Sequence, residues 1–281
     1  EFLFTPDALA YMITGNKVWE YTIGSTSQIM NPRTGDWNKD LLEATGLSAD
    51  VLGKPVLPGT VVGTLTDALA EETGIGKVQV VAVAGHDTAS AVAAVPAEED
   101  GSLVAFLSSG TWSLLGIEVK DAIINEKSFD YNFTNEGGIE GTTRFLKNIC
   151  GMWLYERCRK EWTDAPKSHT ELIAEAMKQP AFQSIINPDD AMFANPSSMI
   201  DAIQTYCRET EQHVPEGYAE ICRCIFDSLA LRYRQVFGYL KEMASFPIEV
   251  LHIIGGGSLN NDLNQFTANS TGAIVLAGPQ E

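Results

Sequence analysis

Residues 77–95 read KVQVVAVAGHDTASAVAAV, and the change of pattern inside this stretch decides how the fold is interpreted. Its first part, 78–84, is apolar with β-branched residues at alternate positions, which predicts a strand buried on both faces. The pattern breaks at Gly85, and the residues that follow predict a helix over 88–95. A strand leading directly into a helix is typical of α/β proteins.

His86 and Asp87 stand side by side at this junction, and two interpretations are open. Asp87 could be the N-cap of the helix that begins at Thr88, a position that Asp favours. Ligands of open α/β sheets, however, bind beyond the carboxyl ends of strands. An ionised carboxylate there could accept a hydroxyl proton during phosphoryl transfer. The pair alone supports both interpretations.

Composition and charge narrow the range of partners. The chain has 281 residues, of which 44% are hydrophobic, enough for one large domain or two ordinary ones. Its 37 acidic and 19 basic residues give a net charge of −18, which disfavours nucleic acid and anionic membranes as partners. A nucleotide stays possible, because backbone N–H groups and a metal ion can hold phosphates. No apolar run reaches the length of a membrane span, and the first residues lack the pattern of a signal peptide.

The five cysteines, none of them in a CxxC pair, predict neither a zinc ribbon nor a dense disulfide framework. We expect buried thiols in a reducing cytoplasm, with a single disulfide left open.

The rest of the chain predicts an α/β fold with a mixed sheet. Two strand pairs are expected in 103–119, with a turn at 108–111, and in 133–148, with Gly137 and Gly138 as the turn. Helices are expected at 6–14, 38–45, 66–73, 148–162, 168–178 and 217–245. Residues 248–281 predict a strand, a glycine turn, a helix and a last strand. Strands joined both by hairpins and by helices favour a mixed sheet.

Two further motifs could contact a ligand. SSGTWS (108–113) is a turn of small residues that could direct backbone N–H groups and the Thr111 hydroxyl at a phosphate, or a plain hairpin turn. IIGGGSLNNDLNQ (253–265) places Gly255, Gly256 and Gly257 between a strand and a helix. These glycines suit close approach of a flat ligand or close helix–strand packing. Asn260 stands where the last glycine of GxGxxG would fall, which disfavours a dinucleotide-dependent oxidoreductase.

Five segments taken in order resemble the FGGY carbohydrate kinases. They are AGHDTASAVAAVPA (84–97), FLSSGTWSLLGIE (106–118), TNEGGIEGTTRFLKNICGMWLYER (134–157), CRCIFDSLALRY (222–233) and IIGGGSLNNDLNQFTANSTG (253–272). The resemblance covers essentially the whole chain, and it is strongest to the branch of the family that phosphorylates L-rhamnulose.

The resemblance implies two domains of actin-like, ribonuclease-H-like fold. Residues 1–77 would be the end of the first, sugar-binding domain, and 78–281 the second, nucleotide-binding domain, truncated at its end. The family's first phosphate-binding hairpin, with a carboxylate that helps to hold Mg²⁺, has no counterpart here, and no metal ligand is assigned in this chain. We therefore expect a piece of a kinase that is inactive by itself.

The resemblance also assigns roles to residues. Asp87 matches the catalytic base and, with His86, Thr88 and Asn148, the substrate-binding positions, although Asn148 could face the nucleotide. Asn148 is expected at the start of a helix, where capping is the alternative role. The positions that match nucleotide contacts are Gly110, Thr111, Gly255, Gly256 and Gly257. At Glu156 some relatives carry a glutamine associated with the nucleotide, so no role is assigned there.

The implied reaction is transfer of the γ-phosphate of ATP, with Mg²⁺, to the 1-hydroxyl of L-rhamnulose in the cytoplasm. Nucleic acid and membrane are not expected as partners, and the oligomeric state is open. One alternative is a kinase of another ketose such as fuculose or xylulose. A second is an actin-like or chaperone-like ATPase on the same fold, which the pairing of His86 with Asp87 at a strand end disfavours.

Overall fold

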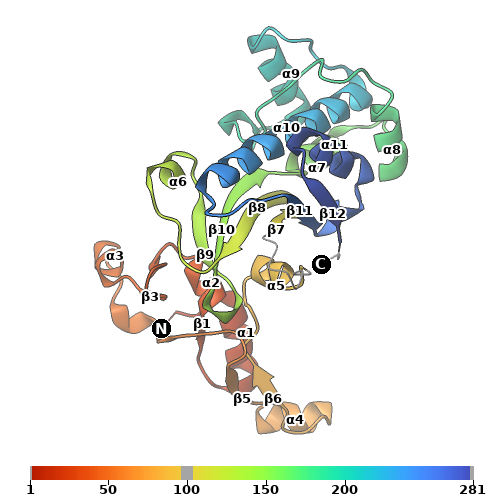
Figure 1. The fold of residues 1–281 in the computed structure, drawn as a ribbon. Coiled ribbons are helices and arrows are strands. Elements are labelled where there is room, and N and C mark those ends of the chain that lie inside the picture. The colour runs from red at the N-terminus through yellow and green to blue at the C-terminus, as the bar shows by residue number, and fades with distance from the viewer. Residues whose placement is uncertain (1, 96–103, 279–281) are drawn as a thin grey trace. The chain divides into compact units, whose positions relative to one another are not determined.

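The structure, a computed structural model, describes residues 2–95 and 104–278. The chain divides into two compact units (Figure 1). Unit 1 comprises Glu1–Pro96 and Ile117–Leu146, and unit 2 comprises Ala97–Gly116 and Lys147–Glu281.

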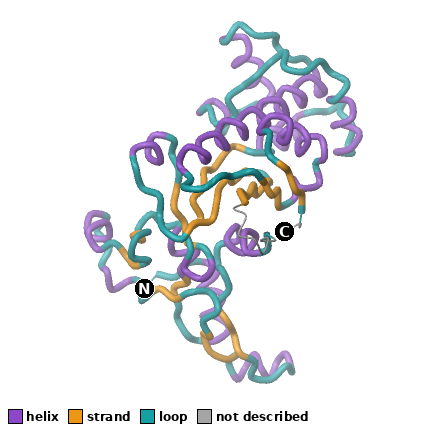
Figure 2. The backbone as a smooth tube through the Cα atoms, in the orientation of Figure 1, coloured by secondary structure: helices purple, strands orange, loops and turns teal. Residues whose placement is uncertain are grey.

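The largest sheet is mixed, as predicted. The strands of the protein are drawn in orange in Figure 2. Its order is β12 (Ile274–Ala277), β11 (Val250–Ile254), β7 (Val104–Ser109), β8 (Trp112–Val119), β10 (Thr143–Cys150) and β9 (Thr134–Gly137). Strand β11 runs parallel to both β7 and β12, whereas β9 and β10 are antiparallel. Both predicted strand pairs are present. Gly110 and Thr111 connect β7 to β8, while a longer connection with the short 3₁₀ helix Ile139–Gly141 joins β9 to β10.

Unit 1 consists of short helices and short strands. Helix α1 (Thr5–Thr14) has a proline in its first turn and ends at Gly15, whose φ of 77° suits glycine. The other helices are α2 (Tyr21–Ser25), α3 (Lys39–Ala44), α4 (Asp67–Thr73), α5 (Asp87–Ala93), α6 (Glu126–Asp130) and the 3₁₀ turn Ala49–Val51. Three small two-stranded sheets pair β1 (Trp19–Glu20) with β4 (Pro55–Val56), β2 (Met30–Asn31) with β3 (Asp36–Trp37), and β5 (Val61–Thr64) with β6 (Gln79–Val81).

The strand predicted at 78–84 is shorter and more exposed than expected. Strand β6 spans only Gln79–Val81 and pairs with β5 through a register irregularity. Val81 and Val83 are 45% and 69% exposed, so the prediction of burial on both faces was wrong. The face that carries Ala82 and Ala84 is buried, whereas the face that carries Val81 and Val83 is exposed. An apolar sequence shows hydrophobicity, but burial on both faces needs a packed element on each side.

Unit 2 is built around the long helix α10 (Gly217–Met243), which packs against α7 (Trp153–Glu161), α8 (His169–Ala176) and α11 (Asn261–Thr271) (Figure 1). Helix α9 (Met199–Glu209), missed in the sequence, packs on α7 and on the 3₁₀ helix Ala191–Phe193. A last 3₁₀ helix, Gly256–Leu259, follows β11. The helix predicted at 148–162 begins only at Trp153, because 143–150 forms strand β10.

All five cysteines are buried and free of disulfides. Within residues 2–95 and 104–278, no helix combines the length and apolar character needed to span a bilayer.

Candidate active site

Asp87 lies at the start of helix α5, which follows strand β6 after a short connection. It is the first residue of the helix, and His86 occupies the N-cap position without a side-chain cap bond. The interpretation of Asp87 as N-cap was therefore wrong, because the helix starts one residue earlier and Ala89 and Ser90 donate to the His86 carbonyl. The Asp87 side chain is 94% exposed, so most of the carboxylate surface is open to a ligand.

The Asp87 carboxylate has local partners only. Its Oδ1 accepts from the backbone N–H of Thr88 at 2.7 Å and lies 3.4 Å from the Thr88 hydroxyl. Thr88 itself is buried. These contacts orient one carboxylate oxygen and leave the other free to accept a proton.

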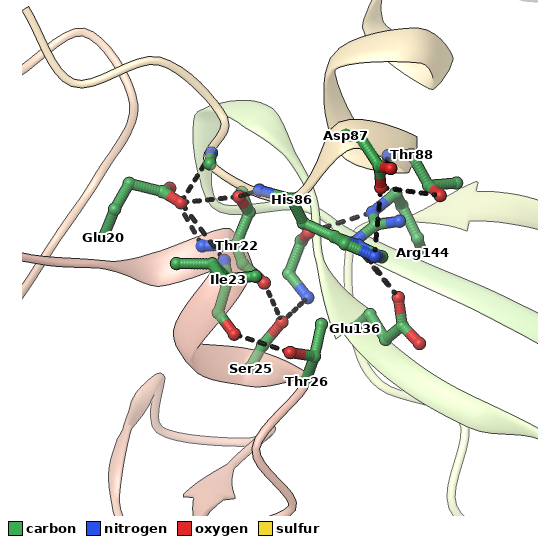
Figure 3. Close-up of polar contacts among 12 residues, drawn as sticks. Glu20, Thr22, Ile23, Ser25, Thr26, His86, Asp87, Thr88, Glu136 and Arg144 are labelled. Carbon is green, nitrogen blue, oxygen red and sulfur yellow. Dashed lines mark hydrogen bonds and ion pairs between the residues drawn. The ribbon is translucent and has the colours of Figure 1, made fainter. Parts of the chain in front are cut away.

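His86 is held at three points (Figure 3). Its backbone N–H donates to the Thr22 hydroxyl at 3.2 Å. Its Nδ1 lies 2.9 Å from Nη2 of Arg144, and its Nε2 lies 3.5 Å from Oδ1 of Asp87. Burial, followed by the positive charge of Arg144, lowers the pKa of His86, and the Asp87 carboxylate only partly offsets this. His86 is therefore neutral at pH 7.

Arg144 and Glu136 form a buried ion pair beneath His86. The two residues face each other across the β9–β10 ladder, and Nη2 of Arg144 lies 3.2 Å from Oε2 of Glu136. Nε of Arg144 also donates to the carbonyl of Gly137 at 3.0 Å. Burial raises the pKa of Glu136, and the adjacent guanidinium opposes that rise.

A second buried carboxylate, Glu20, fixes the backbone just before His86. It accepts from the N–H groups of Thr22 and Ile23 at the start of α2, and from the Thr22 hydroxyl at 2.6 Å. Its Oε2 also accepts from the N–H of Gly85 at 2.8 Å.

Glu20, Thr22, Glu136 and Arg144 were not among the site residues predicted from the sequence. A charged residue inside an apolar strand, as in TRFL (143–146), is a signal that could have identified Arg144. The partners of each charge, however, lie far away in the sequence.

In unit 2, the predicted phosphate-contacting turn is fixed by helix α7. The carbonyls of Gly110 and Thr111 accept from the N–H groups of Met152 and Trp153, at 3.0 Å each. A Cβ on Gly151 would lie 2.9 Å from the Gly110 carbonyl oxygen and 2.5 Å from the Ser113 hydroxyl. Only glycine fits between the turn and the helix, so the turn has a rigid support.

The glycine loop after β11 packs on the same β7–β8 hairpin. A Cβ on Gly257 would lie 2.1 Å from the Ser109 hydroxyl and 2.8 Å from the Ser109 carbonyl oxygen. Beneath them, the buried Tyr233 hydroxyl lies 2.7 Å from the Ser113 hydroxyl, and burial raises the pKa of Tyr233 to about 12. The structure thus brings Gly110, Thr111 and Gly257 together around one hairpin.

Asn148 lies elsewhere than predicted. It is an exposed residue of strand β10, which ends just before Gly151. It cannot cap a helix, so the predicted position at a helix start was wrong.

Gly255 has a φ of 83°, and a Cβ on Gly256 would touch nothing within 4 Å. Both belong to the same loop as Gly257. Glu156, to which no role was assigned, is paired with Arg159 at 3.2 Å.

Neither His86 nor Asp87 lines the two larger cavities of the described residues. One of about 720 Å³ borders α10 and residues 185–188 in unit 2, and one of about 460 Å³ lies beside Tyr21, Arg33 and Lys120 in unit 1. Among residues 2–95 and 104–278, no three His, Cys, Asp or Glu side chains are grouped closely enough to hold a metal ion.

Two family models match the chain. The N-terminal domain model of the FGGY family of carbohydrate kinases matches residues 1–94, and the C-terminal domain model matches residues 105–281. The chain belongs to the FGGY family of carbohydrate kinases.

Curated FGGY relatives include rhamnulokinases. The one from Bacteroides thetaiotaomicron is 56% identical over 279 residues, which cover 99% of this chain and 57% of that protein. The one from Yersinia pestis strain Pestoides F is 46% identical over 281 residues and 56% of its own length. The chain thus spans somewhat more than half the length of the curated relatives it matches.

Solved FGGY structures have the same fold. The ligand-bound xylulose kinase from Lactobacillus acidophilus matches with a TM-score of 0.71 at 16% identity, covering 97% of this chain and 54% of that one. The predicted actin-like α/β fold with a mixed sheet is confirmed. The division predicted at residue 77 stays a prediction.

Proposed function

We propose that this chain is part of a kinase that transfers the γ-phosphoryl group of ATP to the 1-hydroxyl of L-rhamnulose, giving L-rhamnulose 1-phosphate and ADP. The observation that carries the proposal is the 56% identity to a rhamnulokinase across 99% of the chain. The aligned region spans both the segment with Asp87 and the glycine loop, since it covers 99% of this chain.

Asp87 is the proposed catalytic base. Its exposed carboxylate accepts the proton of the sugar O1–H as O1 forms a bond to the γ-phosphorus. The bond from that phosphorus to the β–γ bridging oxygen breaks, and ADP leaves with the electron pair. His86 beside it has Nδ1 occupied by Nη2 of Arg144 at 2.9 Å, so that nitrogen is not available to take the proton.

The nucleotide is proposed to contact Gly110, Thr111 and the loop Gly255–Gly257. The supporting feature is the close packing of Gly257 and Gly151 on one hairpin, where an added Cβ would overlap Ser109 or the Gly110 carbonyl oxygen. Asn148 is proposed as a further active-site contact, and Thr88 as a sugar-side residue. Mg²⁺ bound to the phosphates would neutralise charge. Because the described residues hold no carboxylate cluster for the ion, no step is assigned to it.

The test is ADP release by the complete enzyme with Mg-ATP and a panel of L-rhamnulose, L-fuculose and D-xylulose, run in parallel with Asp87→Asn. We expect fast release with L-rhamnulose and a loss of at least about 100-fold in kcat for Asp87→Asn, at the low end of what a general base contributes. Asp67→Asn is the matched control, since Asp67 is also an exposed first residue of a short helix.

Each other result changes the conclusion in a defined way. Fast release with another ketose would preserve the mechanism and change the substrate. A rate of ADP release that is the same with and without every ketose, and unchanged by Asp87→Asn, would favour an ATPase. Residues 1–281 by themselves should not turn over, because positioning and metal charge supply most of the rate in phosphoryl transfer. Turnover by that chain alone would contradict this expectation.

A further inference from the structure

The ring of His86 has a donor on one side and a carboxylate on the other. Nδ1 lies 2.9 Å from Nη2 of Arg144. Arginine has only donors, so Nδ1 must accept through its lone pair, and the ring proton must be on Nε2. Nε2 is the nitrogen that lies 3.5 Å from Oδ1 of Asp87.

We infer that Arg144, held in place by Glu136, is a positioning residue that fixes His86 as the neutral Nε2–H tautomer facing the Asp87 carboxylate. This inference deepens the proposed kinase function and rests on it for its catalytic meaning. The arrangement leaves Asp87 as the one base at the end of the strand and presents beside it an N–H that can only donate.

The orientation of Arg144 supports this assignment. Its side chain is completely buried, and its best available partner would be the Glu136 carboxylate in a bidentate pair. The guanidinium is not oriented for that pair. Oε2 of Glu136 lies 3.2 Å from Nη2 as an ion pair but without hydrogen-bond geometry, and Nη1 of Arg144 has no hydrogen-bond partner among the described residues. The well-directed bonds run from Nη2 to His86 and from Nε to the Gly137 carbonyl.

Burial and the charge of Arg144 favour the neutral ring, and the nearby carboxylates oppose them only in part. Protonated His86 would place a second positive charge 2.9 Å from Arg144, in a partly buried site. Asp87, on its own helix, is solvated and attracts the proton only weakly. Glu136 on β9 lies 3.5 Å from Nδ1 but is paired with Arg144. Thr22, on α2, contacts only the backbone of His86. Glu20, the N-cap of α2, already accepts four hydrogen bonds from other groups. Glu118 on β8 and Glu20 act on Arg144 and keep it charged.

The chain provides an internal control with the opposite geometry. His169 has its Nε2 2.7 Å from Nη1 of Arg159 and its Nδ1 3.0 Å from the Tyr155 hydroxyl. By the same argument, the proton of His169 is on Nδ1. The two histidines should therefore be opposite tautomers in one sample.

The test is long-range ¹H–¹⁵N NMR of the four histidines in residues 1–281, which reads the tautomer without any activity. We expect His86 as the Nε2–H tautomer with a titration midpoint below 6.5, and His169 as the Nδ1–H tautomer. Arg144→Met with Glu136→Gln removes both buried charges together, which folds more readily than a single unpaired charge. In this double variant the His86 tautomer should become mixed and its pKa should rise. Arg159→Met should change the tautomer of His169 and leave the tautomer of His86 unchanged.

In the complete enzyme, the same double variant should reduce kcat/KM for the ketose about 10- to 100-fold, the range for outer partners that orient a functional histidine. KM for ATP should stay within about twofold. A wild-type His86 with its proton on Nδ1, or an unchanged tautomer in the double variant, would overturn the inference whatever the substrate is. If NMR shows the expected tautomers of His86 and His169 but the complete enzyme phosphorylates none of the ketoses, the proposed function is contradicted and the inference about His86 stands.

Discussion

The carboxylate of Glu20 accepts a hydrogen bond at 2.8 Å from the N–H of Gly85, 65 residues later in the chain. Gly85 is two residues before Asp87, so this bond fixes the backbone from which the proposed base projects. Three further bonds to the same carboxylate come from Thr22 and Ile23 (Figure 3). Glu20 therefore joins the start of α2 to the start of α5.

Glu20→Ala should lower the free energy of unfolding of residues 1–281 by about 2–4 kcal/mol. The substitution leaves buried donors without an acceptor, and hydrogen bonds to a charged group are among the stronger ones. Urea unfolding measures the difference. Glu71→Ala, at an exposed site on α4, is the control and should stay within about 0.5 kcal/mol of wild type. Equal effects of the two substitutions would show that the Glu20 contacts contribute little.

Gly257→Ala and Gly256→Ala form a matched pair in one loop. A Cβ at 257 would overlap the Ser109 side chain and carbonyl, whereas a Cβ at 256 has open space. We expect Gly257→Ala to destabilise the chain by about 1–3 kcal/mol, as overpacking does, and to weaken binding of an ATP analogue by the complete enzyme. Gly256→Ala should change stability little. Calorimetry of both variants measures affinity, and equal affinities would argue against a nucleotide loop that depends on this packing.

Gly238→Ala should stabilise the chain by roughly 0.5–1 kcal/mol. Gly238 lies inside helix α10, and an added Cβ would meet no atom within 4 Å. Alanine loses less backbone entropy than glycine when a helix forms. Thermal unfolding measures the gain. Gly151→Ala, where a Cβ would lie 2.9 Å from a backbone oxygen, should have the opposite sign, and a stabilising Gly151→Ala would contradict the packing described here.

Asp7 should make stability depend on pH. Burial, more than the nearby Glu20 charge, raises its pKa from 3.8 to about 6. The folded state therefore binds the proton more tightly than the unfolded state, so this contribution is complete below pH 3.8 and is lost as the pH rises through about 6.

Asp7→Asn removes that dependence. Relative to wild type, the variant should gain stability between pH 4 and pH 8 by about 1–3 kcal/mol, from a shift of about two pKa units at 1.36 kcal/mol each. Chemical denaturation at both pH values measures the gain. Asp40→Asn, at an exposed site in α3, should show no such gain. Parallel pH curves for wild type and Asp7→Asn would rule out a buried, protonated Asp7.

Individual helices and turns of this protein could be predicted from residues close to them in the sequence. Proline near the start and glycine at the end identified α1, and small residues identified the turn at Gly110 and Thr111. The prediction failed at Asn148, because TRFLKNIC forms strand β10, whose residues Thr143–Leu146 pair with β9, and the helix begins only after it. Strand pairing depends on a partner segment, and a helical pattern beyond Gly151 cannot show where the strand ends.

The sequence by itself determined the class of the fold, the junction of strand and helix at His86 and Asp87, and the glycine loop, because each depends on hydrophobic periodicity or on the backbone freedom of single residues. The tertiary structure decided that Asp87 begins α5 instead of capping it, that Arg144 contacts His86 from 58 residues away, and that Gly257 packs against Ser109. Electrostatic and steric contacts act across space, whereas sequence patterns report only neighbours along the chain. The protonation state of the candidate site therefore depends on the fold.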